Sequence, residues 1–332
     1  MTSSTFKYDP KFHGTIPKVP TEQNRPLWSV VIPTHNCAEY LRLALSSVLQ
    51  QDPGPDLMEI IVVDDHSTKD DPKRVIDDLA GDRVRFIRQS QNVGKARNYE
   101  TGIAASRGQL VHQLHGDDRV HDKFYSSMKY CFDSIPEAGA AFCESEYINA
   151  NGDVVGRTGK ERDTTGLLKN WLEQLVISQR IQTPGIVVRR GVYEQLGAFD
   201  RRLPSFEDWE MWIRIATTYS FAFNAQTLAQ YRVYPENTTN KSLISGRRAH
   251  TLNTTLKIVD SYLPSELLAR CRSSRSRELA QYLTQCIPAV VSQASFSGWL
   301  RLCSAILGHR FSLRTLYRIL RFTFPFRAQK QG

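Results

Sequence analysis

The chain has 332 residues, which suffices for one large domain with an accessory piece or for two ordinary domains. Hydrophobic residues make up 41% and aromatic residues 10%, so the sequence supports a sizeable core and excludes wholesale disorder. Apolar runs stay short of the ~18 residues of a membrane-spanning helix, and the polar N-terminus lacks the apolar segment of a secretory signal. Six scattered cysteines without a CxxC pair predict reduced thiols in a cytoplasmic protein rather than a disulfide framework or a zinc site.

The net charge of +9 is unevenly distributed along the chain. Residues 241–332 hold 15 of the 43 basic residues but only 3 of the 34 acidic ones, or +12, which leaves −3 for the first 240 residues. The basic character therefore belongs to the C-terminal part, and we expect that part to differ in function from the rest.

Residues 1–26 are polar and interrupted by prolines, which predicts an extended N-terminal arm. Short apolar runs then alternate with amphipathic stretches. The predicted strands are Trp28–Ile32, Ile60–Val63, Val84–Ile87, Gln109–Leu114 and Ala140–Cys143. Apolar residues at helical spacing lie between them, so the pattern predicts an α/β domain with a largely parallel sheet flanked by helices. In such sheets ligands bind at the carboxyl ends of the strands.

Beyond about residue 240 the strand pattern fades. The segments Leu252–Tyr262, Glu266–Tyr282 and Trp299–Arg321 read as helices. We therefore predict three parts: an arm at 1–26, an α/β domain at 27–240 and a basic α-helical region at 241–332.

Two acidic residues, Asp64 and Asp65, follow the second predicted strand. A plain turn explains them, because Asp and Ser bond to their own backbone in turns. The functional alternative is a carboxylate that accepts a hydrogen bond from a base. The imide N–H of uracil or thymine, or N1–H of guanine, suits such an acceptor, whereas cytosine and adenine suit it poorly.

A second acidic pair, Asp117–Asp118, follows the fourth predicted strand within His115-Gly-Asp-Asp. Adjacent carboxylates repel each other unless a cation or solvent offsets their charge. An oxygen site of this kind suits Mg²⁺ or Mn²⁺, which bind one or two carboxylates together with substrate phosphates. A solvated turn is the simpler alternative, but the position after a strand end, in a pattern that already carries Asp65, favours a metal.

A third acidic cluster opens the predicted helix that begins near Ser205. Ser205 and Asp208 have the spacing of a capping box, and acids stabilise a helix N-terminus by ~0.3–1 kcal/mol. Capping does not require both Glu207 and Asp208 beside Trp209 and Trp212. A carboxylate on a rigid helix start, flanked by aromatic rings that stack on sugars, would suit a general base.

Two common phosphate-binding motifs are absent from the sequence. Gly94-Lys95 lacks the preceding glycine of a P-loop, and no GxGxxG follows the first predicted strand. The second absence argues against a dinucleotide oxidoreductase.

Five motifs occur in a defined order: Val-Val-Ile-Pro-Thr-His-Asn (30–36), Val-Val-Asp-Asp-His-Ser (62–67), Asn-Val-Gly-Lys-Ala-Arg-Asn (92–98), Gly-Asp-Asp (116–118) and Phe-Glu-Asp-Trp-Glu-Met-Trp-Ile-Arg (206–214). Each motif alone is unspecific, but the set resembles the inverting family 2 glycosyltransferases over roughly residues 28–240, about two thirds of the chain. The resemblance implies the GT-A fold, a Rossmann-like, largely parallel sheet flanked by helices.

The resemblance also implies residue roles on the donor side. Pro33 and His35 would border the base, Thr34 and Asn36 would shape their loop, and Asp65 would accept a hydrogen bond from the base imide.

The remaining implied roles concern the diphosphate and the acceptor. Arg97 would contact the nucleotide from the side, and Asp117 would bind the ribose or lie behind the metal ligands. Asp118 would coordinate the divalent cation that bridges the diphosphate. Asp208 would deprotonate the acceptor hydroxyl for in-line attack at the anomeric carbon, while the metal neutralises the leaving nucleoside diphosphate.

Two positions depart from the family pattern. Many relatives carry an acid two residues before the first Asp of the pair, where this chain has His115. Relatives often follow Tyr-Arg-Val with a histidine, where this chain has Tyr234. The first departure removes a carboxylate from the site, and the second removes a histidine ligand.

The C-terminal region contains no acid from Ser297 to Arg327. Arginines are interleaved with apolar residues, and one helical face gathers Leu313, Leu316, Tyr317, Leu320 and Phe324. Two interpretations stay open: a helix packed on the catalytic domain, or an interfacial helix on an anionic membrane, where each basic residue contributes about 1 kcal/mol. We do not expect nucleic-acid binding, since no nucleic-acid motif accompanies the charge.

The sequence therefore predicts a metal-dependent inverting glycosyltransferase of the hexosyltransferase type. It would move a sugar from a nucleotide diphosphate, UDP in the first place, to a growing glycan or lipid-linked acceptor in cell-surface polysaccharide synthesis. We expect it to be cytoplasmic and peripheral to the inner face of the membrane. The alternatives are a non-catalytic sugar-nucleotide-binding scaffold and a nucleotidyltransferase that uses the same acidic pair.

Overall fold

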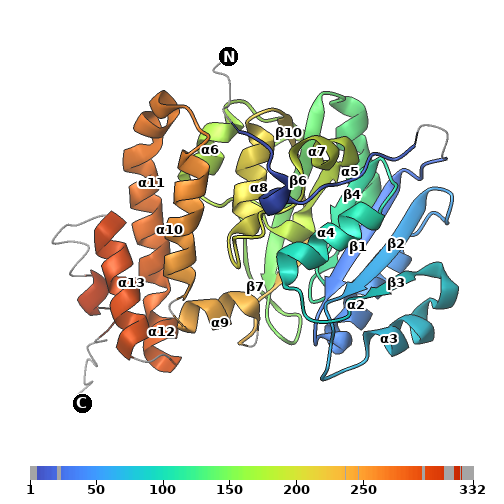
Figure 1. Ribbon diagram of the computed structural model, residues 1–332, viewed down its shortest axis with the longest axis horizontal. Coiled ribbons are helices and arrows are strands. Elements are labelled where there is room, and N and C mark those ends of the chain that lie inside the picture. Colours follow the sequence, from blue (N-terminus) through green and yellow to red (C-terminus); the bar gives the residue numbers. More distant parts are fainter. Residues whose placement is uncertain are drawn as a thin grey trace. The chain divides into compact units, whose positions relative to one another are not determined.

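The structure, a computed structural model of the chain, describes residues 6–20, 24–235, 237–245, 247–293, 296–309, 318–321 and 323. The chain divides into two units. Figure 1 shows their elements, coloured from blue at the N-terminus to red at the C-terminus. An α/β unit comprises residues 6–172 and 180–233. A helical unit comprises residues 173–179 and the chain from residue 234 onward.

One sheet lies at the centre of the α/β unit. Its described strands are β1 (Trp28–Thr34), β2 (Met58–Asp64), β3 (Arg85–Arg88), β4 (Leu110–Gln113), β5 (Arg119–Val120), β6 (Ala138–Ile148), β7 (Val154–Arg157), β8 (Gly166–Leu167), β9 (Ile186–Arg189) and β10 (Ser220–Arg232). They follow the order β3-β2-β1-β4-β9-β6-β10-β5, with β7 beside β6 and β8 beside β10.

The first four strands pair in parallel, which places their carboxyl ends at one edge of the sheet. Thr34 at the end of β1 lies opposite Asp64 at the end of β2. Beyond the end of β4, the backbone N–H of Gly116 still donates to the carbonyl of Pro33 at 2.9 Å. The loops that follow β1, β2 and β4 therefore meet, as the alternation of strands and helices predicted.

Helices cover both faces of this sheet (Figure 1). Those of the α/β unit are α1 (Pro10–His13), α2 (Ala38–Leu49), α3 (Pro72–Leu79), α4 (Lys95–Ala105), α5 (Phe124–Ser134), α7 (Arg190–Leu196) and α8 (Glu207–Ala216); α6 (Trp171–Ile177) is divided between the units. Alternate side chains of β1 point to opposite faces. Val30 and Ile32 pack in a core cluster with Leu45 of α2. Val31 faces α4, where Gly102 permits a close approach, since a Cβ there would lie 2.2 Å from Val31 Cγ1.

The predicted fold class is confirmed: the protein has a mostly parallel sheet flanked by helices, followed by C-terminal helices. The structure also adds strands that the sequence interpretation missed. β9 runs antiparallel between β4 and β6, and the long β10 pairs in parallel with β6 and antiparallel with β5. β9 has only four residues, and β10 contains register shifts that interrupt the regular alternation of a strand.

The N-terminal arm packs on the α/β unit rather than extending away from it. It contains the short helix α1, and the carbonyl of His13 accepts a hydrogen bond from the backbone N–H of Ala198 at 2.6 Å. Arg190 donates to the carbonyl of Pro17 at 2.9 Å. Described residues 6–20 are therefore part of the folded unit.

The described helices of the second unit are α9 (Thr238–Ile244), α10 (Arg247–Asp260), α11 (Ser265–Gln285), α12 (Ile287–Gln293) and α13 (Phe296–His309). An ion pair between Arg275 and Asp260 joins α11 to α10, with 2.6 Å between Nη1 and Oδ1, and Arg248 of α10 donates to the hydroxyl of Tyr282. The predicted helix at 252–262 overlaps α10, which ends at Asp260, and the one at 266–282 lies within α11.

The third predicted helix of the C-terminal region, 299–321, is covered only by α13 and residues 318–321. Several residues on which its amphipathic interpretation depends lie outside the described residues: Arg310, Leu313, Arg314, Leu316, Tyr317, Phe324 and Arg327. Within the described chain, no helix combines the length and apolar character needed to cross a membrane.

Candidate active site

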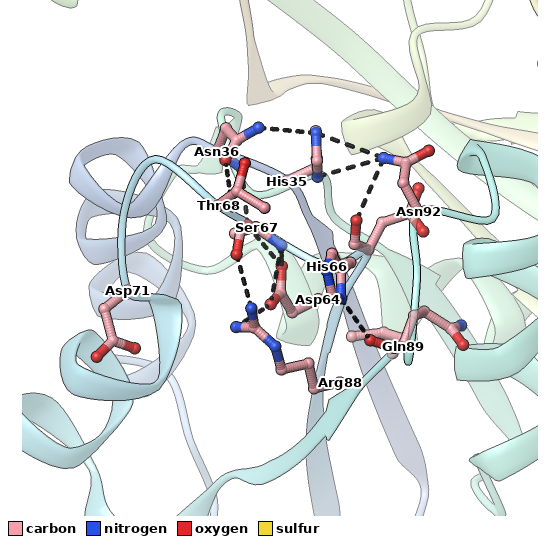
Figure 2. A network of polar contacts seen from close by, with 12 residues as sticks. His35, Asn36, Asp64, His66, Ser67, Thr68, Asp71, Arg88, Gln89 and Asn92 are labelled. Atoms are coloured by element: carbon pink, nitrogen blue, oxygen red, sulfur yellow. Dashed lines mark hydrogen bonds and ion pairs between the residues drawn. The ribbon is translucent and has the colours of Figure 1, made fainter.

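The loop after β1 is held by a closed network of hydrogen bonds (Figure 2). Asn36 adopts a φ of 51°, and its Oδ1 accepts from the backbone N–H groups of Thr68 at 2.9 Å and Lys69 at 3.0 Å. Its own N–H donates to Ser67 Oγ at 2.8 Å. The hydroxyl of Ser67 donates in turn to Asp64 Oδ1 at 2.5 Å. Asn36 therefore shapes the loop by joining it to the turn after β2.

The four predicted residues of this loop differ in exposure. Pro33 and Thr34 end β1 and are buried, and Thr34 Oγ1 lies 3.1 Å from Cys37 Sγ. His35 is exposed, with its Nε2 2.8 Å from Asn36 Nδ2. Of these side chains, His35 is the most accessible to a ligand.

The two acids after β2 have different environments. Asp64 is fully buried and forms an ion pair with Arg88, with 2.9 Å between Oδ2 and Nη1. Asp65 accepts from the backbone N–H groups of Val93 at 2.7 Å and Gly94 at 3.0 Å, which ties the end of β2 to the start of α4. Because each carboxylate oxygen has two lone pairs, these bonds leave acceptor capacity on Asp65. Its contact with a base stays a prediction.

The loop after β4 brings three potential metal ligands together. One ligand atom each from His115, Asp117 and Asp118 lies within 4.8 Å of the others. Gly116 permits the tight packing of this loop, because a Cβ would lie 2.9 Å from Thr34 Oγ1. The backbone alone can fit at this point, so the glycine between the histidine and the acids has a steric role.

Asp118 is almost completely buried, yet among the described residues only one of its oxygens has a hydrogen-bond donor. Oδ1 accepts from the backbone N–H of Arg232 at 2.8 Å. Oδ2 is buried and lacks a hydrogen-bond partner among the described residues. Burial, followed by the charge of Asp117, raises the pKa of Asp118 well above its ordinary value. A buried carboxylate oxygen without a donor is costly, and a cation would remove that cost.

His115 contributes a neutral ring to this cluster. Burial, assisted by the nearby charge of Lys95, lowers the pKa of His115 to about 3. Its Nδ1 lies 3.6 Å from Asp118 Oδ2. A neutral imidazole is the form that binds metals, so the three residues fit a divalent cation.

The start of α8 carries the predicted general base. Asp208 is half-buried, and its Oδ1 accepts from the backbone N–H of Trp209 at 2.8 Å. The helix begins at Glu207, with Phe206 at the N-cap position in the left-handed region at φ 61° and no side-chain cap bond. The capping-box interpretation of Ser205 is therefore wrong, because Ser205 lies before the N-cap.

The two tryptophans of α8 are not available to stack on a sugar ring. Trp209 is 1% exposed and Trp212 is fully buried. Both pack in the core, as expected for two apolar residues three positions apart on the inward face of a helix. The idea that they flank the acceptor site was wrong, because the same spacing that puts them on one face turns that face inward.

Tyr99 of α4 links the metal cluster to the start of α8. Its ring stacks on His115 with 5.2 Å between centroids and 19° between planes. Burial, followed by the charges of Glu207, Asp208 and Asp117, raises the pKa of Tyr99 well above its ordinary value. The structure thus brings the predicted base and the predicted metal cluster to one place, around this side chain.

A model of glycosyl transferase family 2 matches residues 29–197, just over half of the chain and the part that contains the loops after β1, β2 and β4. The chain belongs to glycosyl transferase family 2. An uncharacterized glycosyltransferase of Methanocaldococcus jannaschii is 25% identical over 217 residues, covering 64% of this chain and 72% of the relative. A second one, from Rickettsia typhi, is 27% identical over 226 residues, covering 66% and 67%.

Solved glycosyltransferase structures share the fold of this family 2 transferase. Residues 1–349 of TarS from S. aureus, in complex with UDP-GlcNAc, superimpose with a TM-score of 0.62 at 12% identity, covering 89% of both chains. A mannosyltransferase from Pyrobaculum calidifontis, in complex with GDP-Man and Mn²⁺, gives 0.57 at 17% identity, covering 92% of this chain and 87% of that one. The predicted GT-A fold is thereby confirmed.

Arg97 is the predicted site residue of α4. It lies on the exposed face of α4, whereas its neighbour Asn98 is buried and donates to the carbonyl of Val63 at 2.9 Å. Asn98 therefore has a structural role in this family 2 transferase, and the nucleotide contact of Arg97 stays a prediction.

Sequence reasoning missed three residues of the site, namely Lys95, Tyr99 and Arg232. Lys95 forms an ion pair with Glu207, with 2.7 Å between Nζ and Oε1, and Tyr99 packs on His115. Arg232 at the end of β10 donates through Nε to the carbonyl of Asp117 at 2.9 Å, besides its backbone bond to Asp118. The Gly-Lys-Ala-Arg-Asn motif indicated that the start of α4 belongs to the site. Which side chains of α4 face the site depends on the position of α8, which the sequence does not give.

Proposed function

We propose that this family 2 glycosyltransferase is a metal-dependent inverting hexosyltransferase that takes its sugar from a nucleotide-diphospho-sugar. UDP is the nucleotide that we expect. The observation that carries the proposal is the buried Oδ2 of Asp118, which lacks a donor among the described residues and faces a neutral histidine. A cation at this point would satisfy that oxygen and attract a diphosphate to the sheet edge.

On the donor side, Asp65 would accept the imide N–H of the base, while Pro33, Thr34, His35 and Asn36 form the loop beside it. The hydrogen bonds that fix Asn36 to Thr68 and Lys69 support this role, because they hold the loop rigid without a ligand. Arg97 would contact the nucleotide from the side, and Asp117 would contact its ribose.

Asp118 would hold Mg²⁺ or Mn²⁺. The bound cation supplies charge neutralisation for the leaving nucleoside diphosphate. The backbone N–H of Arg232 and the burial of Asp118 fix the direction of the carboxylate, so that Oδ2 is presented to the site before any ligand arrives.

On the acceptor side, Asp208 would take the proton from the acceptor hydroxyl as that oxygen attacks the anomeric carbon, which inverts the configuration. Its place at the rigid start of α8, next to a Glu207 that is paired with Lys95, supports this role.

The acceptor would be a hydroxyl of a growing glycan or a lipid-linked sugar in cell-surface polysaccharide synthesis. The basic region from about residue 241 supports this part of the proposal, since its +12 charge suits the anionic inner face of a membrane. The catalytic domain would end near residue 240, shortly after the point between residues 233 and 234 at which the two units divide.

A thermal-shift series with UTP and with UDP-, dTDP- and GDP-sugars, each with and without Mn²⁺, tests the proposal. We expect a UDP-sugar to raise the Tm most, and only with the metal; Asp118→Asn should remove the metal-dependent part. Asp163→Asn, at an exposed acid, is the matched control. A Tm shift that is the same with and without Mn²⁺ would contradict the role of Asp118. A larger Tm increase with UTP than with any UDP-sugar would favour a nucleotidyltransferase.

A further inference from the structure

The position of His115 carries a further inference, which rests on the proposed cation. This histidine stands where the family resemblance leads one to expect an acid. An acid would add a third negative charge beside Asp117 and Asp118, whereas a neutral imidazole adds a nitrogen ligand and no charge. Two carboxylates and one imidazole together balance the charge of a divalent cation.

The geometry directs one ring nitrogen of His115 at the acidic pair. Nδ1 lies 3.6 Å from Asp118 Oδ2, which is longer than a hydrogen bond and leaves the pair unbonded. The same Oδ2 is the buried oxygen that lacks a partner within the described part of the chain. Two potential ligand atoms therefore face each other across a distance that a bridging cation would fit.

Two neighbours hold the ring of His115 in this orientation. Tyr99 stacks on one side at 5.2 Å, and Gln113 Nε2 lies 3.2 Å from Nε2 of the ring. Gln113 is 2% exposed, and its Oε1 is buried and without a hydrogen-bond partner among the residues described. Turning this amide by 180° would bring that oxygen onto the Nε2–H of His115 and leave the Nδ1 lone pair directed at the acids.

We propose that His115 is a ligand of the cation through Nδ1, that Gln113 and Tyr99 are positioning residues for its ring, and that the site consequently selects Mn²⁺ or Co²⁺ over Mg²⁺. Metal-binding histidines usually donate their other N–H to a carbonyl or carboxylate, which is the role of Gln113. Imidazole ligands favour first-row transition metals, whereas sites made only of oxygen suit Mg²⁺.

Pulsed EPR on Mn²⁺ bound to the full-length chain with UDP tests this directly. The wild type should show hyperfine coupling from a coordinated nitrogen, and labelling the protein with [¹⁵N]histidine should convert it to the ¹⁵N pattern. His115→Asn should abolish the coupling. His121→Asn is the matched control, because His121 pairs with Glu146 at 3.0 Å and is not a member of the cluster of potential ligands. Bound Mn²⁺ without histidine coupling would overturn the proposal without the need for any variant.

Metal affinity separates the ligand from its positioning residues. Gln113→Leu should weaken Mn²⁺ binding by roughly 10–100-fold, while Gln113→Glu, which keeps an acceptor, should retain most of it. His115→Asp should reverse the preference, so that competition titrations show Mg²⁺ gaining on Mn²⁺. Equal Mn²⁺ affinity in the wild type and Gln113→Leu would contradict the role of Gln113.

The outcomes distinguish this inference from the proposed function. If Mn²⁺ binds in a manner that depends on Asp118 but shows no histidine coupling, His115 is not a ligand and the metal-dependent transferase stands. If neither the wild type nor Asp118→Asn binds Mn²⁺ in the presence of UDP, both proposals fall.

Discussion

The loops after β2 and after β4 lie at the same edge of the sheet but differ in how their polar groups are satisfied. After β2, Asp64 is buried with a full set of partners, namely Ser67 and Arg88. After β4, Asp118 is equally buried, but its Oδ2 lacks a partner among the described residues, as does Oε1 of Gln113 nearby. Both loops carry an Asp-Asp pair in the sequence, so only the surroundings separate them.

This difference indicates which acids stabilise the folded state and which are available to bind a ligand. A buried carboxylate with hydrogen bonds to its own loop stabilises that loop and has little reason to bind anything else. A buried oxygen left without a donor costs free energy that a cation or substrate can recover. The comparison therefore assigns a structural role to Asp64 and supports the proposed metal-binding role of Asp118.

The largest expected effect is at Asp208, the proposed general base at the start of α8. Asp208→Asn should lower turnover by ~10²–10⁴-fold, because the acceptor hydroxyl loses its base. Nucleotide-sugar binding, measured by calorimetry, should be retained, and Asp163→Asn should behave as the wild type. If neither the wild type nor the Asn variant releases nucleotide from any donor, a non-catalytic sugar-nucleotide-binding scaffold is the better description.

A substitution beside Asp64 should lower the free energy of unfolding and leave metal binding unchanged. Ser67→Ala removes the bonds of the hydroxyl to Asp64 and to the N–H of Asn36. Urea unfolding should show a loss of roughly 1.5–3 kcal/mol, with Mn²⁺ affinity unchanged. Thr68→Ala, at an exposed neighbour, is the control. A weaker Mn²⁺ site in Ser67→Ala would break the distinction between the two loops.

His112 of β4 sharpens the comparison, because it is fully buried and has partners for both ring nitrogens. Nδ1 lies 3.1 Å from the hydroxyl of Tyr125, and Nε2 lies 3.0 Å from the carbonyl of Pro184. Burial lowers the pKa of His112 from 6.5 to about 4. The unfolded chain therefore takes up the proton at higher pH than the folded chain, and stability is lost as the pH falls from 6.5 toward 4.

The wild type should accordingly lose about 2 kcal/mol more than His112→Gln between pH 7.5 and pH 5. Unfolding free energies from urea titrations at these two pH values give the difference. Parallel losses in both proteins would show that His112 is protonated in the folded state at pH 5.

The smallest expected effect is at Arg97, which lies on the exposed face of α4. Arg97→Ala should leave stability within about 0.5 kcal/mol of the wild type. The KM for the donor should rise by about 2–5-fold, the range of a solvent-exposed ionic contact. Arg74→Ala, at an exposed arginine of α3, should leave the KM unchanged. An unaltered donor KM in Arg97→Ala would remove this residue from the site.

Much of the α/β fold was predictable because local patterns and tertiary structure agree there. The apolar runs that predicted β1 to β4 lie within or beside these strands, and the helices between them follow from apolar residues at helical spacing. β9 and β10 were missed for physical reasons. A four-residue strand carries too little pattern, and the shifts in β10 between Asn224 and Ala229 interrupt its alternation.

The candidate site was predictable as a set of segments but not as a set of contacts. Asp117 and Asp118 stood out because they follow a strand, and Asp208 because it opens a helix. The partners Lys95, Tyr99 and Arg232 come from elements distant in sequence. No periodicity within one segment encodes such a contact, because it depends on how α4, α8 and β10 pack on the sheet.

The sequence by itself determined the family, the order of the elements and the sheet edge that carries the polar clusters. These follow from motif order and from apolar periodicity, which are local properties of the chain. Only the tertiary structure decided that both acids after β2 have partners whereas Oδ2 of Asp118 has none among the described residues, and only it placed His115 beside Asp118. Burial and hydrogen-bond partners arise from packing between distant segments, so the difference between two Asp-Asp pairs appears only in the folded protein.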